Sequence, residues 1–313
     1  MKILVLGAGA TGGYFGGRFV EAGADVTFLV RPARAQKLRS EGLRITSPRG
    51  NLHVPVAVAT SGEVKPEYDV IILSCKAYDL DDAVTAISLA MGSQTCVLPL
   101  LNGMRHIDAL DRVLGAERVL GGLCQIAVTL DPEGTVAHLN PIHALIFGPR
   151  SAGQQDVCDR LLSAVSQANA DVRLSHQIVL EMWEKWVSII GLAGATCLMR
   201  AAVGDIVTAP GGEKTIHAIL DETAAIASAC GYHPRAEVLA RFRGLFTEPG
   251  SSFTASMLRD IEAKHRIEAD HIVGDLLSRA EACNVATPLL QLIYVHLKAY
   301  EARMAREAAP LGK

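Results

Sequence analysis

The sequence begins with a short apolar run that leads directly into a glycine-rich turn, Lys2-Ile3-Leu4-Val5-Leu6-Gly7-Ala8-Gly9-Ala10-Thr11-Gly12. The run lacks polar alternation, as expected for a strand that is buried on both faces of a sheet. The turn matches G-x-G-x-x-G, in which the glycines permit a tight turn, close approach of a pyrophosphate and close helix–strand packing. We therefore predict a dinucleotide-binding loop made of Gly7, Ala8, Gly9, Ala10, Thr11 and Gly12. A glycine-rich turn without a ligand is the alternative.

The first half of the chain continues with alternating strands and helices. Further strands are expected at Asp25–Val30, Asp69–Cys75 and Thr95–Leu101, and helices at Thr11–Ala22, Pro32–Glu41 and Leu80–Met91. Such alternation predicts βαβ units and a Rossmann-type, doubly wound, mostly parallel sheet. From Val119 to Phe147, strand-like pieces are broken at residues 131–134 and at Asn140-Pro141, which we interpret as antiparallel turns that extend this sheet. A helix at Gly153–Ala168 and a strand at Asp171–Leu174 are expected to close the domain.

Beyond Ser175 the apolar residues recur every three or four positions, which indicates helices. The expected helices are Gln177–Met199, Lys214–Ala229, Glu268–Cys283 and a last one that Thr287-Pro288 opens and that runs toward Met304. The sequence thus predicts two domains: a nucleotide-binding domain at 1–174 and an all-helical substrate and catalytic domain at 175–313. The long C-terminal helices leave a homodimer open.

Composition narrows the classes of function. A formal net charge of −3 over 313 residues provides no broad field for nucleic acid or for an anionic membrane. Seven scattered cysteines without a C-x-x-C pair indicate buried thiols in a reducing compartment, so we expect a cytoplasmic protein. No apolar run is long enough to span a bilayer. His138, His143 and His265 show no ligand spacing, so we expect no metal site and interpret these histidines as surface or capping residues.

The residue that follows the second strand indicates which dinucleotide is bound. An NAD site usually has a carboxylate there, whereas this chain has Arg31, with Arg34 one helical turn later. A guanidinium can hold a 2′-phosphate through paired hydrogen bonds. We therefore predict NADP as cofactor and Arg31 as its contact; an ordinary solvated arginine is the alternative.

Lys76 and Asn102 follow the third and fourth predicted strands. Open α/β sheets bind ligands beyond the carboxyl ends of their strands, so both residues are expected at the cofactor and substrate crevice. Asn102-Gly103 also suits a plain turn in which Asn102 caps the next helix, and the two interpretations are compatible.

Lys185 lies between the only two tryptophans of the chain, in Trp183-Glu184-Lys185-Trp186. Apolar surroundings can desolvate a lysine and prepare it as a proton donor. Periodicity alone favours a surface lysine that packs its apolar stem along an amphipathic helix. Glu268, taken alone, is an acid on a helix surface, and the sequence pattern does not pair it with Lys185.

The whole chain resembles the ketopantoate reductase (2-dehydropantoate 2-reductase) family. The resemblance is carried, in the family's order, by Lys2–Gly12, Arg31, Ser74-Cys75-Lys76-Ala77, Leu101-Asn102-Gly103, Trp183-Glu184-Lys185, Ser256–Asp260, Glu268-Ala269-Asp270 and Thr287-Pro288. It implies an NADPH-dependent reduction of a small 2-oxo acid and a role in pantothenate biosynthesis.

The resemblance also implies roles for single residues. The residue matching Lys185 donates a proton to the keto oxygen, and the one matching Glu268 hydrogen-bonds the substrate and orients the site. The residue matching Ser256 contacts the substrate carboxylate, whereas those matching Lys76 and Asn102 lie between cofactor and substrate. The reaction implied is hydride transfer to the 2-oxo carbon, with the lysine stabilising the developing alkoxide.

The chain departs from the family pattern beside the lysine. Ile189 and Ala193, at i+4 and i+8 from Lys185, replace asparagines, and Ile267 replaces a threonine before Glu268. We therefore predict reduction of ketopantoate to pantoate or of a related 2-oxo acid. An apolar site has little grip on a substrate hydroxyl, so these departures raise the hypothesis that the substrate is not ketopantoate. The alternatives are a reductase of a different, more apolar 2-oxo or 3-hydroxy acid, and a non-catalytic NADP-binding sensor. The joint presence of Lys185, Glu268, Asn102 and Ser256 argues against a sensor.

Overall fold

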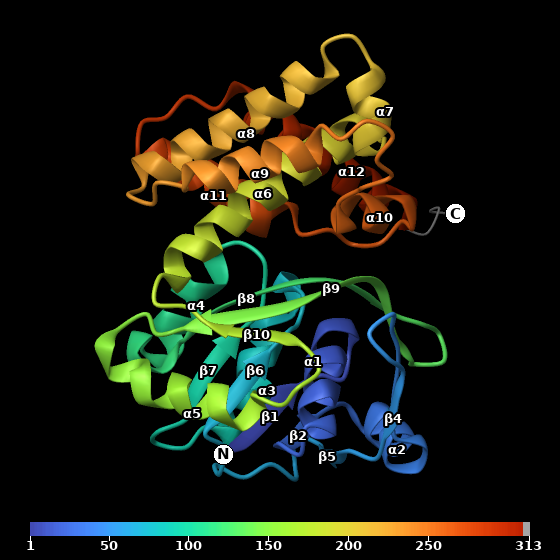
Figure 1. Ribbon diagram of the computed structural model, residues 1–313, viewed down its shortest axis with the longest axis vertical. Helices are drawn as coiled ribbons and strands as arrows, with labels where there is room; N and C mark the ends of the chain where they lie inside the picture. The colour runs from blue at the N-terminus through green and yellow to red at the C-terminus, as the bar shows by residue number, and fades with distance from the viewer. Residues whose placement is uncertain (309–313) are drawn as a thin grey trace. The chain divides into compact units, whose positions relative to one another are not determined.

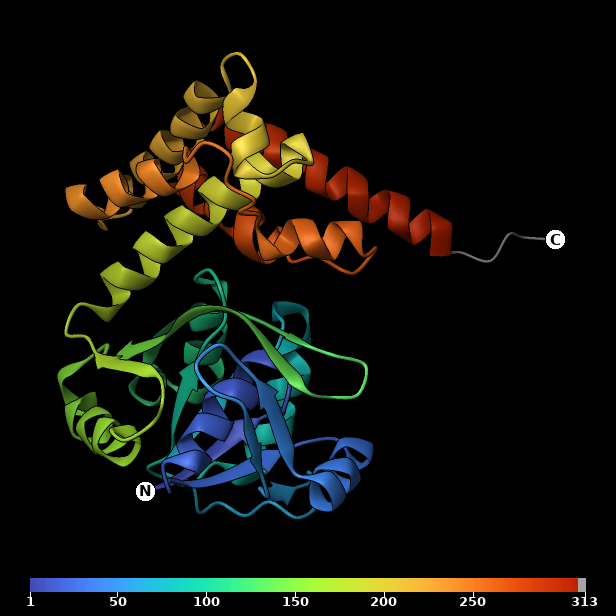
Figure 2. The same cartoon turned by 45° about the vertical axis from the view of Figure 1, so that its right-hand side comes forward.

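The computed structural model describes residues 1–308, and the chain divides into two compact units (Figures 1 and 2). The first unit consists of Met1–Leu101 and His106–Val179. The second consists of the segment Asn102–Arg105 and the chain from Leu180 on. The functional assignment of 1–174 to the nucleotide and 175–313 to substrate and catalysis stays a prediction.

A parallel sheet forms the base of the first unit. Its strand order is β5-β2-β1-β6-β7, and each neighbouring pair is parallel. The strands are β1 (Lys2–Leu6), β2 (Asp25–Leu29), β5 (Ala57–Ala59), β6 (Val70–Leu73) and β7 (Cys96–Pro99). The sheet runs outward in both directions from the neighbours β1 and β6, as in a doubly wound Rossmann sheet, so the predicted fold class is confirmed. Ligand crevices lie where the strand order reverses, at the carboxyl ends of those two strands.

The helices of this unit follow the strands closely. They are α1 (Ala10–Glu21), α2 (Pro32–Glu41), α3 (Leu80–Ile87), α4 (Arg105–Leu114) and α5 (Gln155–Val165), with short 3₁₀ turns η1 (Ala77–Asp79), η2 (Ser88–Ala90), η3 (Ala116–Arg118) and η4 (Ala152–Gln154). The expected helices near the N-terminus therefore begin and end within a few residues of their observed bounds, which is the usual uncertainty at helix ends.

A second sheet corrects the expectation that the segment from Val119 to Phe147 extends the first sheet. Its strands are ordered β10-β9-β3-β4, and β8 pairs with β9. They are β3 (Leu43–Thr46), β4 (Leu52–Val54), β8 (Gly121–Leu130), β9 (Val136–Gly148) and β10 (Asp171–Leu174). Strands β3, β4 and β5 were not predicted, because runs of three or four residues carry too little periodicity.

Helix α1 packs between the two sheets, since it contacts β1 and β2 as well as β3, β4, β8 and β9. A Cβ atom on Gly16 would lie 2.6 Å from the Phe28 ring, and one on Gly17 would lie 2.8 Å from Leu43 and Ile45. Larger side chains at these positions would push the sheets apart. The glycines of α1 beyond the nucleotide motif therefore serve packing.

A bulge in β9 corrects two further expectations. Asn140-Pro141 does not end a strand; instead the pairing with β8 passes from His143 opposite Ile126 to His138 opposite Val128, so residues 139–142 bulge out. His138 and His143 are 6% and 3% exposed and stack at 5.8 Å, so they are neither surface nor capping residues. Each ring forms a hydrogen bond with a side chain: His138 Nδ1 accepts from the Ser47 hydroxyl at 2.8 Å, and His143 Nδ1 lies 2.7 Å from the Tyr14 hydroxyl.

The second unit is helical, as predicted. Its elements are α6 (Ile178–Met199), α7 (Val203–Thr208), α8 (Gly212–Ala229), α9 (Ala236–Phe246), α10 (Ser256–Glu262), the π-helical turn η5 (Asp270–Gly274), α11 (Asp275–Ala282) and α12 (Pro288–Ala308). Close packing against α6 requires small residues: a Cβ atom on Gly191 would lie 2.4 Å from Leu220 of α8, and one on Gly194 would lie 2.7 Å from Ile293 of α12. Within residues 1–308, no helix is both long and apolar enough to cross a membrane.

Candidate active site

The glycine-rich loop connects β1 to α1 at the predicted crevice of the first unit. Gly7 has φ +84°, a conformation that side chains rarely adopt, and its N–H donates to Leu29 O at 2.8 Å. Gly12 sits against the sheet, because a Cβ there would lie 2.4 Å from Ser74 Oγ and 2.9 Å from Gly7 O. Gly9, in contrast, is exposed, and a Cβ on it would meet nothing within 4 Å. No contact within the protein therefore requires a glycine at position 9.

This loop fits a pyrophosphate. Gly9 is the N-cap of α1, has no side chain that could occupy the first N–H groups, and the first turn carries no acidic residue. The free N–H groups and the helix dipole at such an end favour a negative charge. An open glycine at the N-terminus of a Rossmann helix therefore leaves room for a dinucleotide phosphate.

The two arginines that follow β2 have different surroundings. Arg31 is exposed and is the N-cap of α2. The Arg34 guanidinium donates to Ala8 O in the glycine-rich loop at 3.1 Å and to Gly134 O, at the tip of the β8–β9 hairpin, at 2.9 Å. Burial lowers the pKa of Arg34. Arg34 thus connects the loop to the hairpin by hydrogen bonds, a role that was not predicted from the sequence. Arg31 is exposed to solvent.

Lys76 follows β6, next to β1 in the sheet, and is the half-buried N-cap of η1. Ser74, two residues earlier, packs against Gly12 of the loop. The structure therefore places Lys76 in the segment that leaves the carboxyl end of β6, where the strand order reverses. Within the first unit, the glycine-rich loop, Arg31 and Lys76 all lie at carboxyl ends of β1, β2 and β6.

Lys185 belongs to α6 of the second unit and is half-buried. Its neighbours Trp183 and Trp186 are each 1% exposed, with ring centroids 5.0 Å apart. Tyr232 stacks on Trp183 at 4.8 Å, and the Arg279 guanidinium lies 5.7 Å from the centroids of both indoles. The backbone on both sides of Lys185 is therefore held by buried aromatic contacts.

Glu184, the other neighbour of Lys185, is 3% exposed and paired with Arg235. Its carboxylate accepts from Arg235 N at 2.9 Å, from Nε at 2.8 Å and from Nη2 at 2.5 Å. These bonds raise the pKa of the Arg235 guanidinium above its ordinary value. Glu184 carries only a weak sequence signal, as an acid between two tryptophans, and Arg235 carries none.

A hydrogen-bonded cluster connects the helix of Lys185 with the segment of Glu268. Trp186 Nε1 donates to Ile272 O of the π-helical turn at 3.0 Å, and His271 Nε2 of the same turn donates to Asn102 O at 2.8 Å. Burial lowers the pKa of His271, and the charge of Glu268 opposes that shift. The second unit therefore brings together the segments that carry Asn102, Lys185 and Glu268. His271 was not predicted, because nothing in the sequence distinguishes it from a helix-surface histidine.

Three more positions were predicted to shape this site. Ser256 is exposed and begins α10, with Ala255 as the N-cap. Ile189 is half-buried and Ala193 is 2% exposed, both on α6 at i+4 and i+8 from Lys185. Residues at this spacing share one face of a helix, so the face of α6 that carries Lys185 continues with apolar side chains, first the half-buried Ile189 and then the buried Ala193.

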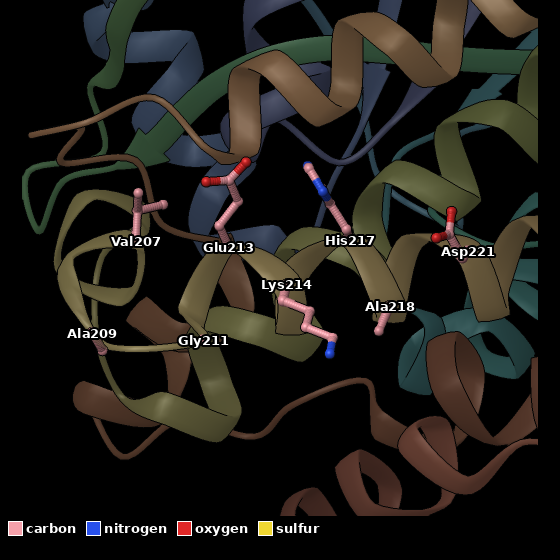
Figure 3. A pocket seen from close by; sticks show the side chains of 8 residues that line it. All are labelled: Val207, Ala209, Gly211, Glu213, Lys214, His217, Ala218 and Asp221. Carbon is pink, nitrogen blue, oxygen red and sulfur yellow. The ribbon is translucent and has the colours of Figure 1, made fainter.

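A surface pocket in the second unit is distinct from these residues. It has a volume of about 590 Å³ and is lined by residues of α7, the following turn and the first half of α8 (Figure 3). None of the predicted site residues lines it. Among residues 1–308, no group of three or more His, Cys, Asp or Glu side chains could hold a metal ion.

The chain is similar to proteins of one family over most of its length. Residues 3–152 match the family model "Ketopantoate reductase PanE/ApbA", and residues 177–301 match its C-terminal model. "Uncharacterized oxidoreductase YkpB" of Bacillus subtilis (strain 168) is 34% identical over 302 residues, covering 96% of this chain and 99% of that protein. The 2-dehydropantoate 2-reductase of Streptococcus pyogenes serotype M18 (strain MGAS8232) is 26% identical, covering 95% and 98%.

Among solved structures, D-mandelate dehydrogenase with NADH and anilino(oxo)acetate superposes with a TM-score of 0.85 at 23% identity, covering 97% of this chain and 99% of that one. The fold defines a protein with a Rossmann-type unit followed by an all-helical unit, and the family matches define an oxidoreductase. The two family matches are more specific: the chain belongs to the ketopantoate reductase family, whose members are NAD(P)-dependent 2-oxo acid reductases. The roles of the individual site residues stay predictions.

Proposed function

We propose that the chain reduces a 2-oxo acid with an apolar side group, using NADPH, and that Lys185 is the general acid. The observation that carries the choice of substrate is the face of α6, where Ile189 and Ala193 continue from Lys185. A substrate with few hydroxyl groups suits this face, because apolar side chains cannot hydrogen-bond a hydroxyl. The solved D-mandelate dehydrogenase, whose structure contains anilino(oxo)acetate, supports an apolar 2-oxo acid on this fold.

The proposed division of labour follows the two units. In the first unit, the N–H groups at the start of α1 bind the pyrophosphate, Arg31 binds the 2′-phosphate, and Lys76 contacts the cofactor and the substrate. A bound nicotinamide supplies the hydride for the 2-oxo carbon. The open position of Gly9 and the exposed guanidinium of Arg31 support this assignment.

In the second unit, the Lys185 ammonium donates its proton to the oxygen that becomes the alkoxide, while Glu268 and Asn102 orient the reacting groups and Ser256 binds the substrate carboxylate. Rigid placement of a proton donor contributes to rate because little reorganisation is needed when the charge develops. The buried Trp183, Trp186 and Glu184 on either side of Lys185 support such placement.

Ketopantoate is the second candidate substrate. Membership of the family favours it, and the 26% identical relative from Streptococcus pyogenes carries that activity in its name. The two candidates differ in one respect: ketopantoate bears a hydroxyl that the face of α6 leaves without a polar partner.

A substrate panel tests the proposal. NADPH oxidation is followed with ketopantoate and with 2-oxo acids that bear aliphatic or aromatic groups, for the parent and for the Ile189→Asn variant. We expect the parent to have a higher kcat/KM for apolar acids than for ketopantoate. The amide should move that ratio toward ketopantoate by about two- to tenfold, because one hydrogen bond is worth about 0.5–1.5 kcal/mol. A parent that uses ketopantoate alone would contradict the choice of substrate, and no turnover with any acid would favour the non-catalytic sensor.

A further inference from the structure

Two of the seven cysteines of the chain lie side by side in the second unit, although 53 residues separate them in sequence. Cys230 is the C-cap of α8 and Cys283 is the C-cap of α11, and their Sγ atoms are 3.2 Å apart. Helix α11 contacts α8, so the proximity of the two caps follows from the packing of two helices.

The exposure of the thiols separates this pair from most of the others. Cys96, Cys124, Cys158 and Cys197 are buried, whereas Cys75, Cys230 and Cys283 are partly exposed. The expectation that all cysteines are buried is therefore wrong for three of them. Burial and the adjacent thiol raise the pKa of Cys230 to about 11, so the Cys230 thiol is largely protonated at neutral pH. A thiol with a raised pKa reacts slowly, and only with an oxidant that reaches it.

We propose that Cys230 and Cys283 are a redox-modification site, which closes to an intramolecular disulfide when the chain meets a small-molecule disulfide such as oxidised glutathione. One thiolate attacks a sulfur of the oxidant, forming a mixed disulfide and releasing one thiolate. The second cysteine attacks the protein sulfur of that mixed disulfide and releases the other. Two protons leave the protein thiols, the two cysteines lose two electrons, and the oxidant becomes two thiols.

The neighbours of the pair give the disulfide a structural consequence. Tyr232, two residues after Cys230, stacks on Trp183, and Arg279, four residues before Cys283, lies over both tryptophans. The bond would join the two segments that hold this aromatic pair. It would also close a long loop in the unfolded chain, which restricts the unfolded state and raises stability.

The test uses the full chain with oxidised glutathione and no denaturant. After free thiols are alkylated, a non-reducing digest is analysed by mass spectrometry, and the Tm is measured before and after oxidation. We expect a cross-linked peptide that contains Cys230 and Cys283, lighter by two hydrogens than the reduced pair. The Tm should rise by several degrees, and a reductant should reverse both changes.

Three variants control the experiment. Cys75→Ser removes the third partly exposed thiol and should leave the cross-link and the Tm rise intact. Cys230→Ser and Cys283→Ser should each abolish both. The inference is overturned if the parent retains stable mixed glutathione adducts at these positions, if neither cysteine reacts while Cys75 does, or if the cross-link forms without raising the Tm. None of these readouts depends on turnover, so they are independent of the proposed reaction.

Discussion

At the scale of single residues, Lys185 carries the proposed chemistry. Lys185→Ala removes the proton donor, so kcat should fall by about 10²–10⁴-fold, the usual contribution of general acid catalysis. The neighbours Trp183, Glu184 and Trp186 stay packed, so the Tm should change little. Steady-state turnover and thermal unfolding measure the two effects. Lys214→Ala, which removes an exposed lysine of the same unit, is the control that should leave kcat unchanged.

Arg31 decides the proposed preference between dinucleotides. Arg31→Ala should reduce the preference for NADPH over NADH by about 10- to 100-fold, since a hydrogen bond to a charged group is worth about 1.5–3 kcal/mol. The kcat/KM values for the two dinucleotides provide the measurement. Arg34→Ala is not an equivalent change, because Arg34 binds Ala8 O and Gly134 O; it should weaken the binding of both dinucleotides alike. If the Arg31 variant keeps the parent's preference for NADPH over NADH, Arg31 does not bind the 2′-phosphate as proposed.

At the scale of elements, Gly9, the N-cap of α1, and Gly12, in its first turn, lack a side chain for opposite reasons. Gly12→Ala should destabilise the fold by about 1–3 kcal/mol, because its Cβ would lie 2.9 Å from Gly7 O, a backbone atom that cannot rotate away. Gly9→Ala should leave stability unchanged within about 1 kcal/mol, since its Cβ would meet nothing.

The same pair separates packing from ligand binding. Gly9→Ala should raise the Kd for NADPH, because the added methyl group occupies the space that we assign to the pyrophosphate. Urea unfolding and nucleotide titration measure the two properties. If both variants lose stability equally, or if Gly9→Ala binds NADPH as the parent does, the assignment of the loop is wrong.

The bulge in β9 makes the first unit sensitive to acid. Burial lowers the pKa values of His138 and His143, so the unfolded chain binds these protons at a higher pH than the folded chain. By linkage, these two histidines do not reduce the free energy of unfolding above the ordinary histidine pKa of about 6.5. As the pH falls below that value, the free energy of unfolding decreases. Conversion of both residues to asparagine, which can retain a hydrogen bond at the Nδ1 position, should flatten this dependence.

Unfolding by urea at a series of pH values between about 7 and 5 checks this expectation. The parent should lose more stability over that range than the double variant His138→Asn and His143→Asn. His271, whose pKa burial also lowers, is in the other unit and is retained in both proteins, so its contribution cancels in the comparison. Identical slopes would show that the two buried histidines do not couple to folding.

At the scale of the whole molecule, the features of the fold that depend on local sequence patterns could be predicted. Buried runs such as Ile3–Leu6 and the glycine motif indicated the parallel sheet and the order of its first elements. Strands β3 to β5 were too short to show a period, and the second sheet could not be distinguished from an extension of the first. Contacts between distant residues could not be predicted from local sequence: Arg34 with Gly134, Glu184 with Arg235, His271 with Asn102, and Cys230 with Cys283.

The segment Asn102–Arg105 belongs to the helical unit although the chain on both sides of it belongs to the other. Its carbonyl at Asn102 accepts from His271, and a Cβ on Gly103 would lie 3.3 Å from His271 O. A fragment that starts at Leu180 would therefore lack the partner of a buried imidazole N–H. A chimaera that exchanges the C-terminal half between two relatives has to carry these four residues with it, so the interchangeable module is discontinuous in the gene.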